Sequence, residues 1–174
     1  MFKWLFGKRN DGGAPQQAGG TGEVVVVSRT VPVARAEAFA AFVDRMGSWW
    51  PRDYTWSGDR LATFGVEPRI NGRAYETDTS GTSRTWGTVL SLERPTHIVI
   101  AWQIAANRDP ELGEATSSRV DIRFAEVDPQ TTEVVVVHRD FPRHGDGWQA
   151  YRSRMAGKKG WPRLIELYAK SVGG

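Results

Sequence analysis

Alternation of apolar and polar residues marks most of the chain as β-strand. Residues 120–125 read Val-Asp-Ile-Arg-Phe-Ala, with a large apolar side chain at every second position of the first five. That is the period of a strand with one buried face. The same reasoning predicts further strands over residues 24–31, 63–68, 73–79, 86–92, 98–104 and 133–141. Residues 54–56 are a weaker candidate. Short turns such as Asn71-Gly72 favour an antiparallel meander of these strands.

Helical periodicity follows the first strand and returns at the C-terminal end. Apolar residues at i, i+3, i+4 and i+7 predict one helix that Gly47 ends; they are Phe39, Phe42, Val43 and Met46. The C-terminal segment carries two apolar stripes, one at Trp148, Tyr151 and Met155 and one at Trp161, Leu164, Ile165, Tyr168 and Val172. On a straight helix the stripes would lie roughly 120° apart. Because Gly157, Gly160 and Pro162 separate them, we expect an interruption near residues 157–161.

These elements predict one α+β domain in which a curved antiparallel sheet of about six or seven strands grips the C-terminal helix. The space between sheet and helix is where a small ligand would bind. Residues 10–22 contain no large apolar side chain, so that composition cannot offset its ordering entropy. We therefore expect residues 1–22 to form a flexible tail and residues 23–174 to form the domain.

Composition and charge narrow the classes of partner. The net charge is +3, of which the first 22 residues carry +2, so the domain itself is nearly balanced. This balance argues against a nucleic-acid partner, and the basic run near the C-terminus is interpreted as a solvated helix face. No apolar run approaches the roughly 20 residues of a membrane span, so stable membrane association is not expected. The absence of cysteine is consistent with a cytoplasmic location.

The histidines and carboxylates show no ligand spacing of a metal centre. His97, His138 and His144 form no His-x-x-x-His or Glu-x-x-His pattern. No phosphate-binding glycine loop and no Gly-x-Ser-x-Gly motif is present. We therefore expect neither a metal nor a cofactor.

Several short motifs carry a family resemblance. A strand over residues 24–31 leads through Pro32-Val33 into a helix that ends at Trp49-Trp50-Pro51. Trp86-Gly87-Thr88-Val89, a strand ending at Trp102, and the Gly-Trp pairs at 147–148 and 160–161 follow in order. Over about residues 23–170 the chain resembles the activator of heat-shock-protein-90 ATPase homologue-like (AHSA-type) branch of the START-like (SRPBCC) superfamily. The resemblance implies a helix-grip fold with a cavity between the final helix and the sheet.

The resemblance leaves three functions open. The first is a module that binds a small hydrophobic or aromatic molecule without a clear catalytic centre. The second is a polyketide cyclase/dehydratase-like enzyme that uses a histidine or tyrosine of the cavity as acid or base. The third is a co-chaperone-like domain that binds a chaperone or another protein partner through its basic final helix.

Candidate ligand-binding residues follow from strand phase and aromatic content. His138 is in phase with Val134 and Val136, so all three should face the same side of the sheet. Each predicted site residue either should face the expected cavity or has a side chain that could contact a ligand. These residues are Trp50, Tyr75, Trp86, Trp102, Val136, His138, Trp161, Leu164 and Tyr168. Packing in the core is the alternative interpretation of each aromatic residue, and a structural histidine is the alternative for His138.

Overall fold

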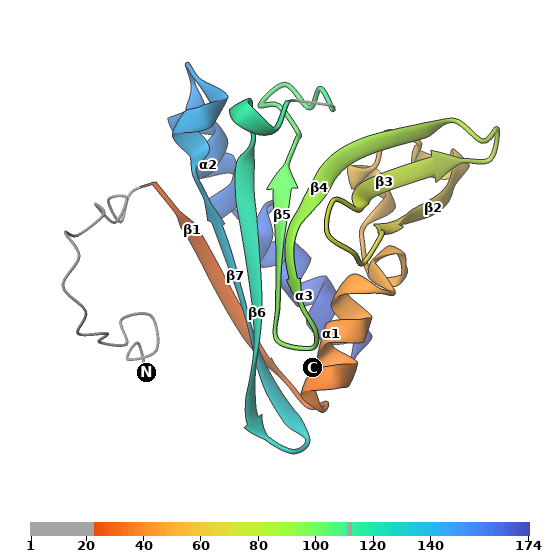
Figure 1. Ribbon diagram of the computed structural model, residues 1–174, viewed down its shortest axis with the longest axis vertical. Coiled ribbons are helices and arrows are strands. Elements are labelled where there is room, and N and C mark those ends of the chain that lie inside the picture. The colour runs from red at the N-terminus through yellow and green to blue at the C-terminus, as the bar shows by residue number, and fades with distance from the viewer. Residues whose placement is uncertain (1–22, 111–112) are drawn as a thin grey trace.

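Seven antiparallel strands form one sheet that curls around the C-terminal helices (Figure 1). The computed structural model describes residues 23–110 and 113–174, so the tail predicted for residues 1–22 lies outside the described residues. The strands are β1 (Val25–Val31), β2 (Leu61–Val66), β3 (Arg73–Asp78), β4 (Ser83–Glu93), β5 (His97–Trp102), β6 (Ser118–Asp128) and β7 (Thr131–Arg139). Their order across the sheet is β1-β7-β6-β5-β4-β3-β2. The predicted helix-grip architecture is confirmed.

Three α-helices and five single 3-10 turns complete the described chain. The helices are α1 (Arg35–Val43), α2 (Trp148–Ala156) and α3 (Trp161–Ser171). The 3-10 turns are η1 (Met46–Ser48), η2 (Arg52–Tyr54), η3 (Gly58–Arg60), η4 (Glu114–Thr116) and η5 (Phe141–His144). None of the helices in the described ranges has the length and apolar character needed to cross a membrane.

Two local predictions are wrong. The weak strand candidate at 54–56 is instead the end of η2 and a turn, in which the Thr55 hydroxyl accepts from Gly58 N and donates to Arg52 O. The first helix ends at Val43 rather than at Gly47. Gly47 lies in η1, where a Cβ atom would stand 2.6 Å from the carbonyl oxygen of Phe64. A glycine there permits close approach of η1 to β2.

Strand β4 departs from simple alternation. Its pairing shifts register on both sides, once with β3 between the Ala74 and Tyr75 pairs and once with β5 after Val89. Trp86 and Leu90 are the extra residues, so Val89 is fully buried while Leu90 faces outward. Unbroken alternation over the predicted strand 86–92 would place Trp86, Leu90 and Leu92 on one face, and the two register shifts prevent this. Such bulges bend a strand and increase its twist, which explains the curl toward β2.

The C-terminal helix is interrupted as predicted. Helix α2 ends at Ala156 and α3 begins at Trp161, with a backbone hydrogen bond of 2.8 Å from Gly160 N to Gly157 O in the turn between them. Pro162 follows in the first turn of α3, where its missing N–H leaves no bond unmade. Helix α3 buries its apolar stripe against the concave face, behind the sheet in Figure 1.

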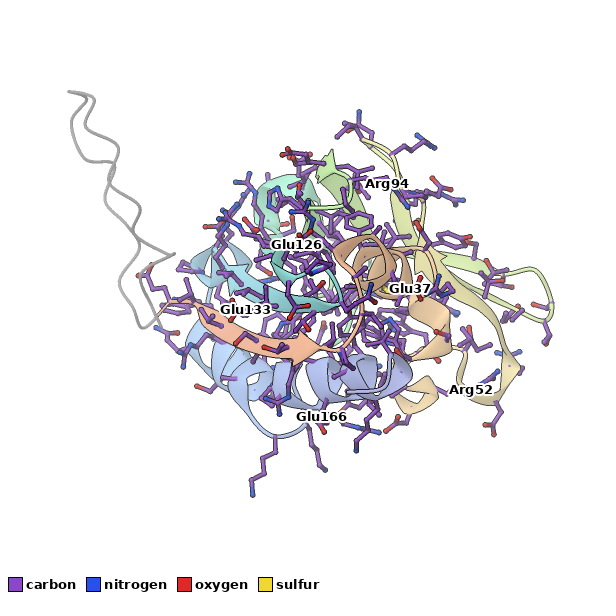
Figure 2. The ribbon with its side chains drawn as sticks, turned by 90° about the horizontal axis from the view of Figure 1, so that it is seen from below. Glu37, Arg52, Arg94, Glu126, Glu133 and Glu166 are labelled. Carbon is purple, nitrogen blue, oxygen red and sulfur yellow. The ribbon has the colours of Figure 1, made fainter. Side chains whose placement is uncertain are left out.

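Apolar side chains fill the space between the sheet, α1 and α3. Phe42 of α1 contacts Tyr168 of α3 and Phe124 of β6, with ring centroids 4.8 and 5.9 Å apart. Tyr168 donates its hydroxyl to the carbonyl of Ala38, at 2.9 Å, and so joins the two helices. In the view from below, Glu166 is labelled on α3 at the lower edge of the molecule, and Glu37, Glu126 and Glu133 are labelled nearer the middle of the view (Figure 2).

Candidate functional site

Five aromatic residues form a connected group in the interior, beside the start of α3. Trp50, Phe64 and Trp86 are nearly parallel, with centroids 4.8 to 5.9 Å apart and interplanar angles of 12° to 20°. Trp102 meets the edge of Trp86 at 5.6 Å and reaches Trp161 at 5.6 Å. We call these five residues the aromatic cluster. It joins β2, β4 and β5 to α3 and to the turn after η1.

Two of the four indole N–H groups of the cluster have a hydrogen-bond partner, and two have none. Trp102 donates to the hydroxyl of Tyr151 at 2.8 Å, and Trp161 donates to Nδ1 of His138 at 3.0 Å. The indole nitrogens of Trp50 and Trp86 are buried and have no hydrogen-bond partner. A buried donor without a partner costs about 1–3 kcal/mol. Two such donors on stacked rings are suited to an acceptor that is supplied by another molecule.

A directional hydrogen-bond chain crosses the interior from α3 to η5. Because Trp161 donates to Nδ1 of His138, the proton of this neutral imidazole is on Nε2, which lies 2.7 Å from Oγ of Ser118. Ser118 Oγ accepts this hydrogen bond, and its own O–H donates a hydrogen bond of 2.8 Å to Nε2 of His144. The proton of His144 is then on Nδ1, which is buried and has no partner. Four side chains from four elements thus form one chain.

Burial sets the charge state of these groups. Desolvation, followed by the charge of His144, holds the pKa of His138 well below its ordinary value. Desolvation also lowers the pKa of His144. Burial raises the pKa of Tyr151 to about 12, although the hydrogen bond from Trp102 opposes this. Near neutral pH all three are uncharged. Both His138 nitrogens are engaged, so neither is free to take a proton from a ligand in this arrangement.

Glu76 is a buried carboxylate that sequence reasoning did not select. It is fully buried on the inner face of β3 and accepts hydrogen bonds from Ser57 N, from Ser57 Oγ and from Trp56 N at 2.6 to 3.1 Å. Three donors compensate a buried carboxylate. The side chain therefore holds the loop after η2 against the sheet. The only signal in the sequence was its phase, which opposes that of Tyr75.

The structure brings most predicted site residues together. Trp50, Trp86, Trp102, Trp161 and His138 are in or directly against the aromatic cluster. The other inward-facing predictions are buried elsewhere in the same interior; they are Val136, Leu164 and Tyr168. Tyr75 stands apart, because it points to the outer face of β3, where the guanidinium of Arg73 lies 5.1 Å from its ring.

Other interior residues escaped the sequence interpretation. Phe64 belongs to the aromatic cluster, Ser118 and His144 belong to the hydrogen-bond chain, and Tyr151 accepts a hydrogen bond from Trp102. Phe64 was recognisable only as an apolar strand residue. Nothing in the sequence indicates that Ser118 bridges two histidines.

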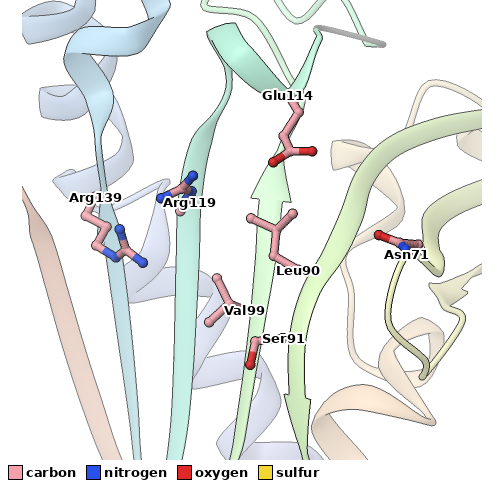
Figure 3. A pocket seen from close by; sticks show the side chains of 7 residues that line it. All are labelled: Asn71, Leu90, Ser91, Val99, Glu114, Arg119 and Arg139. Carbon is pink, nitrogen blue, oxygen red and sulfur yellow. The ribbon is translucent and has the colours of Figure 1, made fainter.

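A hollow lies on the outer face of the sheet, opposite the aromatic cluster (Figure 3). Its volume is about 440 Å³, and it is lined by Asn71, Leu90, Ser91, Val99, Glu114, Arg119 and Arg139. Arg119 and Arg139 are directly opposed on β6 and β7, and Asp140 lies 3.7 and 2.8 Å from them. Glu114 adds a second carboxylate (Figure 3), so this hollow has no excess of either charge.

The described residues offer no alternative site for a metal. No group of three or more histidine, aspartate or glutamate side chains within residues 23–110 and 113–174 is arranged to hold an ion.

Comparison with known proteins places this geometry in context. The model of a family described as Activator of Hsp90 ATPase homolog 1-like protein matches residues 32–169. Among solved structures, the anthrahydroquino-γ-pyrone synthase Txn09 is 25% identical and covers 86% of this chain and 97% of its own, with a TM-score of 0.60. The self-sacrificing resistance protein CalC from Micromonospora echinospora is also 25% identical, with coverages of 86% and 94% and a TM-score of 0.60.

A third solved structure and the curated proteins add less. An Hsp90 activator from Plasmodium falciparum is 17% identical and covers 83% of this chain and 94% of its own, with a TM-score of 0.52. At this identity the likeness extends to the fold alone. No curated protein matches the sequence.

Proposed function

The chain belongs to the family of Activator of Hsp90 ATPase homolog 1-like proteins, and on that fold we propose that it binds a planar aromatic molecule bearing oxygen acceptors. The ligand lies against the aromatic cluster, and its oxygens accept from Trp50 and Trp86. The observation that carries the proposal is the pair of buried indole N–H groups without partners on stacked rings. Native interiors rarely leave such donors unpaired.

Entry of a ligand requires the stacked rings to separate. Trp50 is the most exposed ring of the cluster, at 9%, and follows η1 rather than lying within a strand. It is therefore the ring that can move with least disruption of the sheet. The free energy needed to open the stack is subtracted from the contact energy, so we expect micromolar rather than nanomolar affinity.

Two lines of support come from outside the cluster. The synthase Txn09 is named for a fused aromatic product that carries oxygen atoms, which is the ligand chemistry proposed for this chain. The hydrogen-bond chain favours binding over catalysis, because both nitrogens of His138 and the hydroxyl of Tyr151 already have partners. A cyclase-like reaction would need one of these groups to be free. None of the interior contacts described above favours a co-chaperone-like role.

A Trp86→Phe variant tests the proposal with 2-(hydroxymethyl)anthraquinone as a neutral probe. The wild-type protein should bind it with a micromolar Kd, measured by quenching of tryptophan fluorescence. Trp86→Phe keeps an aromatic ring but removes the N–H, so we expect a Kd about five- to tenfold higher. Stability without the probe should fall, because the smaller ring leaves a cavity in the packed cluster, and removal of an unpaired buried donor offsets only part of that cost.

Trp102→Phe is the matched control. It removes an indole N–H that already has a partner, the hydroxyl of Tyr151. We expect it to lower the free energy of unfolding by about 1 kcal/mol more than Trp86→Phe does, because it loses a hydrogen bond in addition to ring volume, and to change the Kd less. No binding by the wild-type protein would refute the proposed function. Equal affinity of wild type and Trp86→Phe would show that Trp86 is not the donor.

A further inference from the structure

Three segments meet beside the aromatic cluster and are fastened by hydrogen bonds. We call residues 52–57, 105–109 and 154–163 the rim. Tyr54 donates its hydroxyl to Lys159 O at 2.6 Å, and Arg108 donates to Tyr54 O at 2.8 Å. Trp56 donates to Arg108 O and Arg154 donates to Ala106 O, both at 2.9 Å. Tyr54 and Trp56 also pack against the buried core, so the rim borders the interior.

Arginines of the rim lie over aromatic rings. The guanidinium carbon of Arg163 is 4.6 Å from the ring centroid of Tyr54, and that of Arg108 is 5.9 Å from Trp56. Arg154 lies 5.7 Å from the ring of Tyr151, whose hydroxyl accepts from Trp102 of the cluster. One ring therefore separates the charge of Arg154 from the proposed ligand site. Stacking on an aromatic face fixes each charge in place.

The charge of the rim is largely uncompensated. Its three segments contain six basic residues and two acidic ones. Arg163 is paired with Asp53, at 2.9 and 3.2 Å. Arg108 and Arg154 donate to backbone carbonyls, and no carboxylate of the described residues lies within ion-pair distance of either. A solvated helix face, the interpretation from sequence, does not account for side chains that bind other segments.

We propose that the rim makes the interior site selective for anionic aromatic ligands, with Arg108 and Arg154 as the residues that determine this preference. The inference rests on the proposed function and names its ligand class: a planar ring system that carries a carboxylate or a similar anion. The rings contact the cluster, and the anion remains at the rim beside the two guanidiniums. Charges near a protein surface attract through an effective dielectric between those of water and the interior, so a preference of about tenfold is expected.

Two ligands that differ in one group test the inference. Anthraquinone-2-carboxylate and 2-(hydroxymethyl)anthraquinone share their rings and carbonyls, and only the first is charged at pH 7. At low salt the carboxylate should bind the wild-type protein about tenfold more tightly. The difference should fall to two- or threefold at 0.5 M sodium chloride, because salt screens exposed charges. In Arg108→Gln/Arg154→Gln it should vanish at low salt, while the Kd of the neutral ligand stays within twofold of wild type.

A control variant removes the same charge elsewhere. Arg29 and Arg69 lie on β1 and on the turn after β2, where they pair with Glu166 and Glu67. Arg29→Gln/Arg69→Gln should keep the tenfold preference, and thermal unfolding should show that both double variants are folded. Equal affinities for the two ligands in the wild-type protein would overturn the inference and leave the proposed function standing. A preference that persists without Arg108 and Arg154 would overturn it as well. Failure of both ligands to bind would refute the proposed function itself.

Discussion

Replacing Gly160 with alanine should lower the free energy of unfolding by about 3 kcal/mol, the upper part of the range for overpacked sites. A Cβ atom at Gly160 would lie 2.1 Å from the carbonyl oxygen of Met155 and 2.7 Å from that of Arg154. Both atoms belong to the backbone of α2, so no side-chain rotation relieves the overlap. The turn would have to widen, and Trp161, which it delivers into the aromatic cluster, would shift with it. Urea unfolding monitored by circular dichroism measures the loss.

Gly157→Ala is the matched control in the same turn. Its backbone is extended, with φ −73° and ψ 169°, and a Cβ atom would lie 3.4 Å from the oxygens of Ser153 and Arg154. That is an ordinary van der Waals contact, so we expect a change within about 0.5 kcal/mol. Similar losses in the two variants would show that close approach at Gly160 does not maintain the break between α2 and α3.

The break illustrates what the sequence predicts well. The phase difference between the stripes of Trp148 and Trp161 is a property of helix geometry alone, and the structure has the interruption where the two stripes part. Period-two alternation likewise located β6 and β7, because these two strands pair in a single register from Arg119↔Arg139 to Glu126↔Thr132. In β4 the alternation failed at Trp86 and Leu90, since a bulge is determined by pairing with both neighbouring strands.

The sequence predicted which residues of the candidate site face inward, but it did not predict the hydrogen bonds between them. Strand phase placed His138 inward, and the tryptophans were recognisable as large apolar residues with a donor. Which of those donors has a partner depends on atoms contributed by distant segments. Ser118 accepts a hydrogen bond from His138 on β7 and donates one to His144 on η5. The backbone N–H of Trp56 donates to Glu76, 20 residues away in the sequence. Hydrogen bonds between distant segments do not produce a periodic pattern in the sequence.

His138→Leu should destabilise the protein by about 3 kcal/mol. The substitution keeps a buried apolar volume but removes the acceptor of Trp161 Nε1 and the donor to Ser118 Oγ. Each buried polar group left without its partner costs about 1–3 kcal/mol. His97→Leu is the control, because the side chain of His97 is 24% exposed and its partner Asp121 keeps a hydrogen bond from Arg123. His97→Leu should lower the free energy of unfolding by less than about 1.5 kcal/mol. Equal losses in the two variants would contradict a structural role for the hydrogen-bond chain of His138.

The same histidine should make stability depend on pH below neutrality. An unfolded histidine gains a proton as pH falls through about 6.5, whereas burial holds the pKa of His138 in the folded protein well below that value. Between these two pKa values the unfolded state binds more protons, so stability is complete above pH 7 and is lost as pH falls. Between pH 7 and pH 5 the loss from His138 is limited to about 2 kcal/mol by the unfolded pKa, and His144, whose pKa burial also lowers, should add to the loss. Urea unfolding at the two pH values should show a smaller loss of unfolding free energy in His138→Leu than in wild type. If that variant is too unstable, NMR titration of labelled histidine in the wild-type protein gives the folded pKa directly. An imidazole signal of His138 that titrates near pH 6.5 in the folded protein would contradict the prediction.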